Sequence, residues 1–348
     1  MAIPYRTRRR LKRLGSLFLS LLVLAACAWL CWVIWVERYI IYTEDGAVID
    51  FDLNPVIPMG EVAQPPIAGE GPEIHYNEGE NAVNTSTDLL QMSGYYITYD
   101  LLKNDFDNVK AKVADLPTNT PVMIDVKGGY GSFYYSSNVE GAVISQSLNV
   151  SQIDELIQLM HQKNLYMIAR IPAFQDYTFA LNHVTSGIPF VGGGGALWMD
   201  AEGCYWLKPK DSTTVGYLTS IVLELKNLGF DEVVLDKFWV PASERVQYTG
   251  DAAADLAECA NRLVSATTTN SFTVSFTVSD PAFPLPEGRC RMYLTGIPAR
   301  DVEITGAKAT FTDPQIRLVF IADSMDTRFD TYGVLRTIDL LDSEEETP

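Results

Sequence analysis

The chain has 348 residues, of which 47% are hydrophobic and 20% are charged. Its 44 Asp and Glu residues outnumber its 26 Lys and Arg residues, which gives a formal net charge of −18 at pH 7. This composition excludes a disordered polyampholyte and a polytopic membrane protein. The acidic balance also argues against nucleic acid as a partner, because phosphate binding needs a basic face.

The first 43 residues have the pattern of a membrane anchor. A basic cluster between Arg6 and Arg13 precedes 23 uncharged residues, 14–36, which as a helix would span a hydrocarbon core of about 30 Å. The positive-inside rule then predicts a single-pass protein with a cytoplasmic N-terminus and an extracytoplasmic body. Two alternatives also place the body outside the cytoplasm. One is a lipoprotein lipidated at Cys27 of a Leu-Ala-Ala-Cys sequence, and the other is a cleaved secretory signal.

The remaining chain divides into a linker, a folded region and a short tail. Residues 44–92 are rich in Pro, Gly and acidic residues without a sustained apolar period, which predicts a flexible linker. Residues 93–341 alternate β-branched or aromatic runs with helical patterns, as repeated βα units do. Their length, near the ~250 residues typical of the fold, favours a (β/α)8 TIM-like barrel. A doubly wound open sheet is the alternative, although no G-x-G-x-x-G follows the first strand. Residues 342–348 form an acidic tail.

Within the predicted barrel, strands and helices are expected in alternation. The expected strands are 95–99, 121–126, 165–171, 232–236, 272–278 and 291–295, with a late strand at 316–322 and the seventh within 302–311. Helices are expected over 104–116, 151–162, 216–227 and 251–267. The second of these has apolar residues at helical spacing and a cap at Asn149 or Ser151, and Gly229 is expected to end the third.

Charged residues recur at the ends of these strands, where barrels place their active sites. Asp125 and Lys127 end the second strand, Arg170 lies in the third with Asp176 beyond it, and Asp236 and Lys237 end the fourth. Asp280 ends the fifth strand, and Asp323 at the last is expected to be an ordinary solvated residue. Asp236 follows the apolar run Val233–Leu235 and therefore needs partners, for which Lys127, Arg170 and Lys237 are candidates.

Aromatic residues accompany the strand ends. They are Tyr130, Tyr134, Tyr135, Phe174, Tyr177, Trp198, Tyr205 and Trp206. Sugars stack their C–H faces on such rings, so an acidic cleft with aromatic walls suits carbohydrate better than phosphate ligands. The alternative is that these side chains pack the loops onto the barrel.

No motif in the sequence calls for a metal or a cofactor. The three histidines form no H-E-x-x-H pattern, and Cys204, Cys259 and Cys290 lack the paired spacing of metal ligands. These three cysteines are either buried thiols, the favoured reading, or one disulfide with a free thiol.

Four segments resemble a family of bacterial extracytoplasmic proteins named putative glycoside hydrolases, formerly a domain of unknown function. They are V-K-G-G-Y-G-S-F-Y-Y-S (126–136), Y-M-I-A-R-I-P-A-F-Q-D (166–176), W-x-D-x-x-G-x-x-W-x-x-P (198–209) and G-F-D-E-V-V-L-D-K-F-W-V-P (229–241). The resemblance extends from about Gly94 to Asp280 and implies a TIM barrel that acts on carbohydrate. The positions that match the family's patterns are Lys127, Arg170, Asp176, Asp231, Glu232, Asp236, Asp280 and Pro241.

The sequence also departs from this family at three places. The family's Asp after Lys127 is Gly128, the Lys before Asp176 is Gln175, and the Arg-Phe before Pro241 is Trp239-Val240. Part of the polar site has therefore changed, which implies either a changed substrate or a lost reaction.

Two functions follow as predictions. The first is a glycoside hydrolase of a cell-envelope or extracellular polysaccharide, with Asp236 as nucleophile or base and Asp280 as the acid beside an apolar wall of Phe283 or Trp239. The substrate-binding residues are then Lys127, Arg170, Asp176, Trp198, Trp206, Lys237 and Trp239. The alternative is a catalytically inactive barrel that binds glycan or serves as a scaffold at the cell surface.

Overall fold

The computed structural model describes residues 29, 40–43, 46–49 and 89–341. No helix in this described part is both long and apolar enough to cross a membrane. The predicted anchor over residues 14–36 lies outside the described residues except for Trp29, and so do most of the predicted linker and the tail at 342–348. Two short strands that the sequence analysis did not anticipate, β1 (Ile40–Thr43) and β2 (Gly46–Ile49), form an antiparallel pair.

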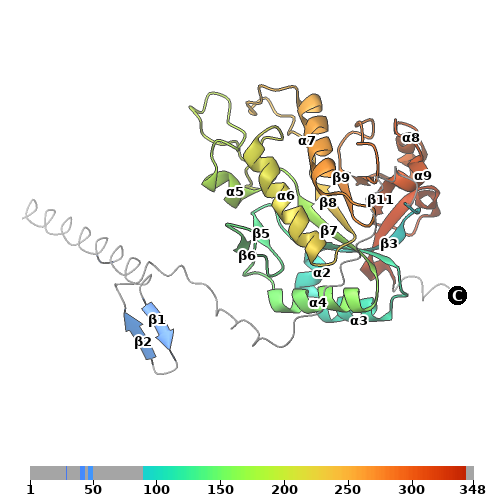
Figure 1. Cartoon of the computed structure of the whole chain (residues 1–348), viewed down its shortest axis with the longest axis horizontal. Helices are drawn as coiled ribbons and strands as arrows, with labels where there is room; N and C mark the ends of the chain where they lie inside the picture. The colour runs from blue at the N-terminus through green and yellow to red at the C-terminus, as the bar shows by residue number, and fades with distance from the viewer. Residues whose placement is uncertain (1–28, 30–39, 44–45, 50–88, 342–348) are drawn as a thin grey trace, which may run out of the picture. The chain divides into compact units, whose positions relative to one another are not determined.

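Eight parallel strands of the described residues close into a barrel, as predicted (Figure 1). Each strand pairs with the next along the chain, and the last pairs with the first. In chain order they are β3 (Ser93–Ile97), β4 (Pro121–Asp125), β7 (Tyr166–Pro172), β8 (Glu232–Asp236), β9 (Thr273–Thr277), β10 (Met292–Thr295), β11 (Leu318–Ala322) and β12 (Gly333–Thr337).

The helices that follow the first four strands of the barrel are α2 (Tyr99–Asn104), α3 (Phe106–Asp115), α4 (Val150–Gln162), α5 (Tyr177–Asn182), α6 (Ser212–Asn227) and α7 (Ala252–Thr267). Asn149 caps α4 through the N–H of Gln152, as the sequence suggested, and Gly229 follows α6 with a φ of +90°, which suits a helix C-terminus. The start of α6 at Ser212 precedes the predicted start because Asp211 accepts from the N–H of Thr214.

The last third of the barrel differs from the prediction. The expected seventh strand within 302–311 is wrong, because Val302–Gly306 forms the helix α8. The seventh strand is β11, and the eighth, β12, was missed. Short elements cover these strands: β10 to β12 are joined by η1 (Ala299–Asp301), α8, α9 (Pro314–Arg317) and η2 (Thr327–Thr331), and η3 (Ile338–Leu340) follows β12. With few long helices as spacers, the periodic signal that separates strands along the sequence is weak here.

Alternation along the strands builds the barrel interior in layers. Tyr166, Ile168 and Arg170 are alternate residues of β7, and Glu232, Val234 and Asp236 are alternate residues of β8. The middle layer is apolar, and it forms its own cluster of buried side chains, namely Met92, Tyr96, Met123, Ile168, Val234, Tyr293, Val319 and Leu335. Met92 and Leu89, which the prediction assigned to the linker, are buried with the barrel.

A buried polar network closes the N-terminal end of the barrel. Glu232 and Arg291 form an ion pair of 2.6 Å with side chains 0% and 4% exposed. Glu232 also accepts from the hydroxyls of Tyr166, Tyr293 and Ser275. Because conserved chemistry in this fold sits at the opposite end, this network stabilises the barrel rather than forming a site. A functional site is expected in the polar layer at the C-terminal end.

Candidate active site

A cleft of about 240 Å³ opens at the C-terminal ends of β4, β7 and β8. This end of a barrel is where the loops after the strands converge and where ligands bind. The residues that line the cleft are Tyr99, Asp125, Lys127, Gly128, Gly129, Tyr134, Arg170, Pro172, Gln175, Glu202, Asp236 and Lys237.

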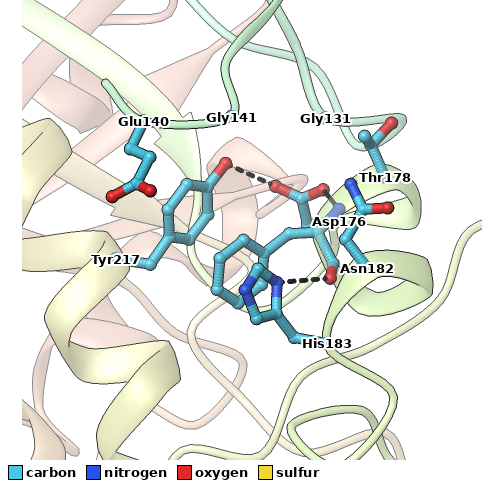
Figure 2. Close-up of a pocket in the computed structure, with 9 residues that line it drawn as sticks. Gly131, Glu140, Gly141, Asp176, Thr178, Asn182, His183 and Tyr217 are labelled. Atoms are coloured by element: carbon cyan, nitrogen blue, oxygen red, sulfur yellow. Dashed lines mark hydrogen bonds between the residues drawn. The ribbon is translucent and has the colours of Figure 1, made fainter.

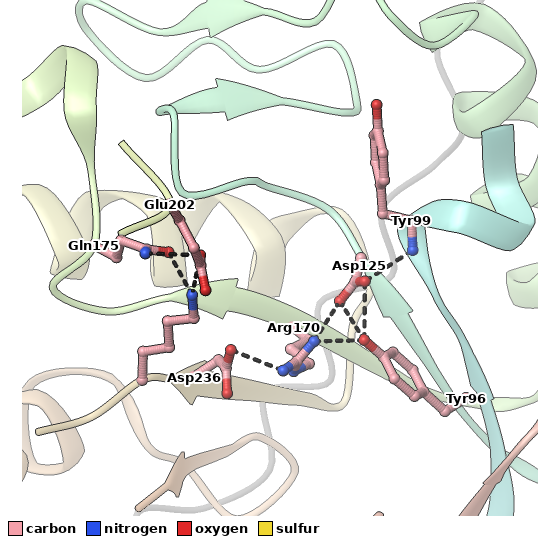
Figure 3. Close-up of polar contacts among 8 residues, drawn as sticks. Tyr96, Tyr99, Asp125, Arg170, Gln175, Glu202 and Asp236 are labelled. Atoms are coloured by element: carbon pink, nitrogen blue, oxygen red, sulfur yellow. Dashed lines mark hydrogen bonds and ion pairs between the residues drawn. The ribbon is translucent and has the colours of Figure 1, made fainter. Parts of the chain in front are cut away.

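Arg170 lies between two carboxylates at the floor of the cleft (Figure 3). Its Nη1 is 3.1 Å from Oδ1 of Asp125, and its Nη2 is 2.8 Å from Oδ2 of Asp236. Asp125 pairs with Arg170 in the sheet, whereas Asp236 pairs with Pro172, two residues beyond Arg170, and the long Arg170 side chain reaches both carboxylates. One guanidinium therefore bridges the two carboxylates.

Asp125 is held by more groups than Arg170 alone. The Tyr96 hydroxyl donates to both carboxylate oxygens at 2.9 Å, and the N–H of Tyr99 donates to Oδ2 at 2.9 Å. Burial nevertheless raises the pKa of the Asp125 carboxyl above its ordinary value, against the opposing effects of Arg170 and these hydrogen bonds. A raised pKa beside a second carboxylate is the property of a general acid.

A second set of contacts holds one wall of the cleft. The Lys237 ammonium lies 2.7 Å from both Oε1 of Gln175 and Oε2 of Glu202, and the Gln175 amide donates to Glu202 and to Asp200. The hydrogen bond from Lys237, followed by that from Gln175, lowers the pKa of Glu202. Glu202 therefore stays a carboxylate at neutral pH. Lys237 itself has a φ of +51°, an uncommon conformation that occurs often at functional sites.

Glu202 belongs to the long segment between α5 and α6, which folds over the barrel as a set of antiparallel bridges. Asp200 organises its tip, because Oδ1 accepts from the N–H groups of Glu202 and Cys204 while Oδ2 accepts from the Trp206 indole at 2.7 Å. Burial acts to raise the pKa of Asp200, but the hydrogen bonds that its carboxylate accepts outweigh burial, and the pKa is lowered. Glu202 reaches the cleft because this tip is fixed.

Lys127 and Asp176 pair with each other. Their ion pair measures 2.7 Å, and both side chains are 1% exposed. Asp176 also caps α5 through the N–H of Phe179 and accepts from the Tyr217 hydroxyl. The structure therefore gives Lys127 a partner other than the Asp236 expected from the sequence. The Asp176 carboxylate is therefore fully engaged in contacts within the fold.

A small cavity of about 30 Å³ adjoins this ion pair (Figure 2). Asp176 and Tyr217 point toward each other in it, and His183 stacks on Phe179 with a centroid separation of 4.1 Å. A cavity of this size has room for one or two water molecules. It is too small for a sugar, so the larger cleft is the candidate site.

The glycines after Lys127 allow two side chains to approach the backbone closely. A Cβ at Gly128 would lie 2.1 Å from the Tyr134 hydroxyl, and a Cβ at Gly129 would lie 2.3 Å from Oε1 of Gln175. An Asp at position 128, which the resembling family has, would therefore collide with Tyr134. Gly128 thus makes room for Tyr134, and Gly129 makes room for Gln175, in the same wall of the cleft.

The other residues predicted for the site are distributed differently. Asp236, Arg170, Lys127 and Lys237 line the cleft, whereas Asp280, Trp198, Trp206 and Trp239 are not among its lining residues. The Asp280 side chain is exposed and accepts from the N–H of Ala282 in its own loop. Trp206 is buried near Trp239, with 6.0 Å between ring centroids, and its indole donates to Asp200 in the segment that carries Glu202.

Three residues at the site were missed: Asp125 and Glu202, which line the cleft, and Tyr96, whose hydroxyl donates to Asp125. Asp125 was recognised at a strand end, but nothing in the sequence showed that Arg170 would join it to Asp236. Tyr96 has a signal in retrospect, because period-two alternation from Gly94 directs it into the barrel. No sequence signal pointed to Glu202, since its position depends on how the long segment between α5 and α6 folds.

The three cysteines favoured as buried thiols, Cys204, Cys259 and Cys290, are free and buried.

The barrel and its cleft define a TIM-barrel protein with a charged site at the C-terminal face. The profile of the family described as "Putative glycosyl hydrolase domain" matches residues 94–272, about half of the chain, and the chain belongs to this family. No curated protein sequence matches the chain significantly.

Solved structures of similar shape were also found. A hypothetical protein from Ruminiclostridium thermocellum is 21% identical with a TM-score of 0.44, and the match covers 53% of this chain and 96% of that one. The PgaB (BpsB) glycoside hydrolase domain from Bordetella bronchiseptica is 9% identical with a TM-score of 0.49, over 74% of this chain and 96% of that one. An α-galactosidase from Lactobacillus brevis is 11% identical with a TM-score of 0.49, over 72% of this chain but only 38% of that one.

Proposed function

We propose that this protein is a glycoside hydrolase that cleaves a cell-envelope or extracellular polysaccharide with Asp236 and Asp125 as its carboxyl pair. The observation that carries the proposal is the arrangement of both carboxylates on Arg170 at the floor of the cleft. Membership of a glycosyl hydrolase domain family supports the same class of reaction. Chemistry of this class needs two carboxyl groups and no metal or cofactor.

In this mechanism Asp125 is the general acid, because burial raises its pKa and favours the protonated form. It gives its proton to the glycosidic oxygen as the bond from that oxygen to the anomeric carbon breaks. Asp236 acts on the other side of the anomeric carbon. It either takes a proton from the attacking water or forms a glycosyl ester that water then hydrolyses. Arg170 orients both carboxylates, and Lys237 with Glu202 offers polar contacts to the sugar hydroxyls.

The experiment compares three isosteric variants, Asp236→Asn, Asp125→Asn and Asp280→Asn. The release of reducing ends from a panel of soluble polysaccharides is measured together with thermal melting. We expect the first two variants to lose at least about a hundredfold in turnover, and Asp280→Asn to match the wild type. Loss in Asp280→Asn with activity in Asp125→Asn would instead support the pair predicted from the sequence, and full activity in Asp236→Asn would refute both pairs.

A second candidate function is glycan binding without hydrolysis. The observation that favours it is the Tyr134 hydroxyl, which fills the space beside Gly128 where the resembling family has an Asp. Titration of the purified protein with the same polysaccharides separates the two functions. Binding without release of reducing ends from any of them would support the binding function, and release would exclude it.

The proposal also places the barrel outside the cytoplasm, held by a single membrane span over residues 14–36. The support is the basic cluster before this uncharged segment. Protease added to intact cells should degrade the barrel, and the protein should remain with the membrane in a Cys27→Ser variant. Release of that variant from the membrane would instead indicate the lipoprotein. Protection of the barrel until the cells are lysed would contradict the orientation.

A further inference from the structure

Three tyrosines form a continuous aromatic row at the edge of the cleft. Tyr177 stacks on Tyr205 with 5.0 Å between ring centroids and an interplanar angle of 12°, and the Tyr130 ring contacts Tyr177 at 6.0 Å with a tilt of 52°. The row joins the cleft at two points. Tyr130 directly follows Gly129, and its hydroxyl donates to the main-chain oxygen of Glu202 at 2.8 Å. Both Gly129 and Glu202 line the cleft.

Tyr130 is at once exposed and fixed. Tyr130 is 57% exposed, which is high for a large aromatic residue. The backbone forms a turn closed by the N–H of Gly131 on the oxygen of Gly128 at 2.9 Å. The Tyr130 carbonyl accepts from the hydroxyl of Thr178 at 2.7 Å. A ring held at both ends has already lost the rotamer freedom that a ligand would otherwise have to remove.

The backbone of this turn is also constrained. Gly131 has a φ of +85°, and a Cβ there would lie 2.4 Å from Oδ1 of Asp176. Asp176, which pairs with Lys127, therefore lies against the turn that carries Tyr130.

We propose that Tyr130, Tyr177 and Tyr205 form a sugar-stacking subsite next to the cleft, so that the ligand is an extended oligosaccharide chain and not a single terminal sugar. This inference rests on the proposed function for the identity of the ligand class. The chemistry that fits is a pyranose ring whose apolar C–H face lies on the exposed face of Tyr130. Sugar units beyond the one in the cleft are then bound over the rim formed by residues 128–131 and 199–206.

The test measures binding of the full-length protein, purified in detergent, to an array of hexose and N-acetylhexosamine oligomers of two to eight units. Wild type should bind the longer oligomers of its preferred sugar more tightly than the dimer. Tyr130→Ala should weaken binding of the longer oligomers by about fivefold to tenfold and leave the dimer unchanged.

Tyr130→Phe is the matched control, because it keeps the ring and removes the hydrogen bond to Glu202. The subsite requires Tyr130→Phe to retain the preference for longer oligomers. Equal losses in both variants would show that the hydroxyl only holds the loops together, and this would overturn the subsite. An unchanged length preference in Tyr130→Ala, or no binding to any oligomer, would overturn it as well.

The two proposals fail separately. Failure of hydrolysis with a length preference that depends on Tyr130 would refute the enzyme and support the subsite. Hydrolysis with no effect of Tyr130→Ala on chain-length dependence would refute only the subsite.

Discussion

The Arg170 guanidinium pairs with two carboxylates at the floor of the cleft. The variant Arg170→Met keeps an unbranched apolar stem but removes the charge, so it tests the effect of that charge on the stability of the protein and on the pKa of Asp125. The Arg170, Asp125 and Asp236 side chains are 20%, 13% and 8% exposed, and the two contacts measure 3.1 and 2.8 Å. Breaking a buried pair costs about 3–5 kcal/mol. Because this cluster borders an open cleft, solvent screens part of the interaction. We therefore expect Arg170→Met to lower the free energy of unfolding by about 2–4 kcal/mol at pH 7.5.

The destabilisation caused by Arg170→Met should be smaller at low pH than at neutral pH. Burial already raises the pKa of Asp125 in the folded protein, and removing Arg170 removes an interaction that lowers it. A carboxyl whose pKa is higher in the folded state binds more protons there, so folding weakens as pH rises above the unfolded pKa of about 4. The deficit of Arg170→Met should therefore fall below about 1 kcal/mol near pH 4, where Asp125 takes up a proton.

Urea denaturation at pH 4, 5.5 and 7.5, followed by tryptophan fluorescence, measures these free energies. Lys110→Met is the control, since its ion pair with Glu155 is 41% and 61% exposed, and it should change stability by no more than about 1 kcal/mol at any pH. Arg170→Met combined with Asp125→Asn should recover part of the stability at pH 7.5. A deficit that is constant with pH would refute the electrostatic reasoning.

Three further outcomes are expected. In thermal melts, Gly128→Ala should destabilise the protein by about 1–3 kcal/mol through the clash with the Tyr134 hydroxyl. Adding Tyr134→Phe to the same chain should relieve most of this destabilisation. A double variant in which the two effects simply add would contradict this reasoning. Glu232→Gln should cost about 3–5 kcal/mol by leaving the Arg291 charge unpaired, without altering glycan affinity, and a loss of affinity at equal stability would contradict its structural role. In pH–rate profiles, kcat/KM should fall on the alkaline side as the raised pKa of Asp125 is passed, and a rate that rises there would exclude it as the acid.

Much of the barrel could be read from the sequence because its first five strands alternate with long amphipathic helices. The strand at Glu232–Asp236 was predicted to the residue, and the ends of most others within about two residues. Prediction failed for the strand expected within 302–311, which is the helix α8, and for β12, which was missed, since no long periodic segment separates the last strands.

The sequence alone indicated the barrel and the charged ends of its strands. The apolar run before Asp236 puts it at a strand end, and apolar residues at helical spacing predict α4. Tertiary structure decided the partners. Arg170 joins Asp236 to Asp125, Lys127 pairs with Asp176, and Asp280 faces solvent. The physical reason is that ion pairs depend on distances of a few ångströms between strands far apart in the chain, and local patterns carry no information on those distances.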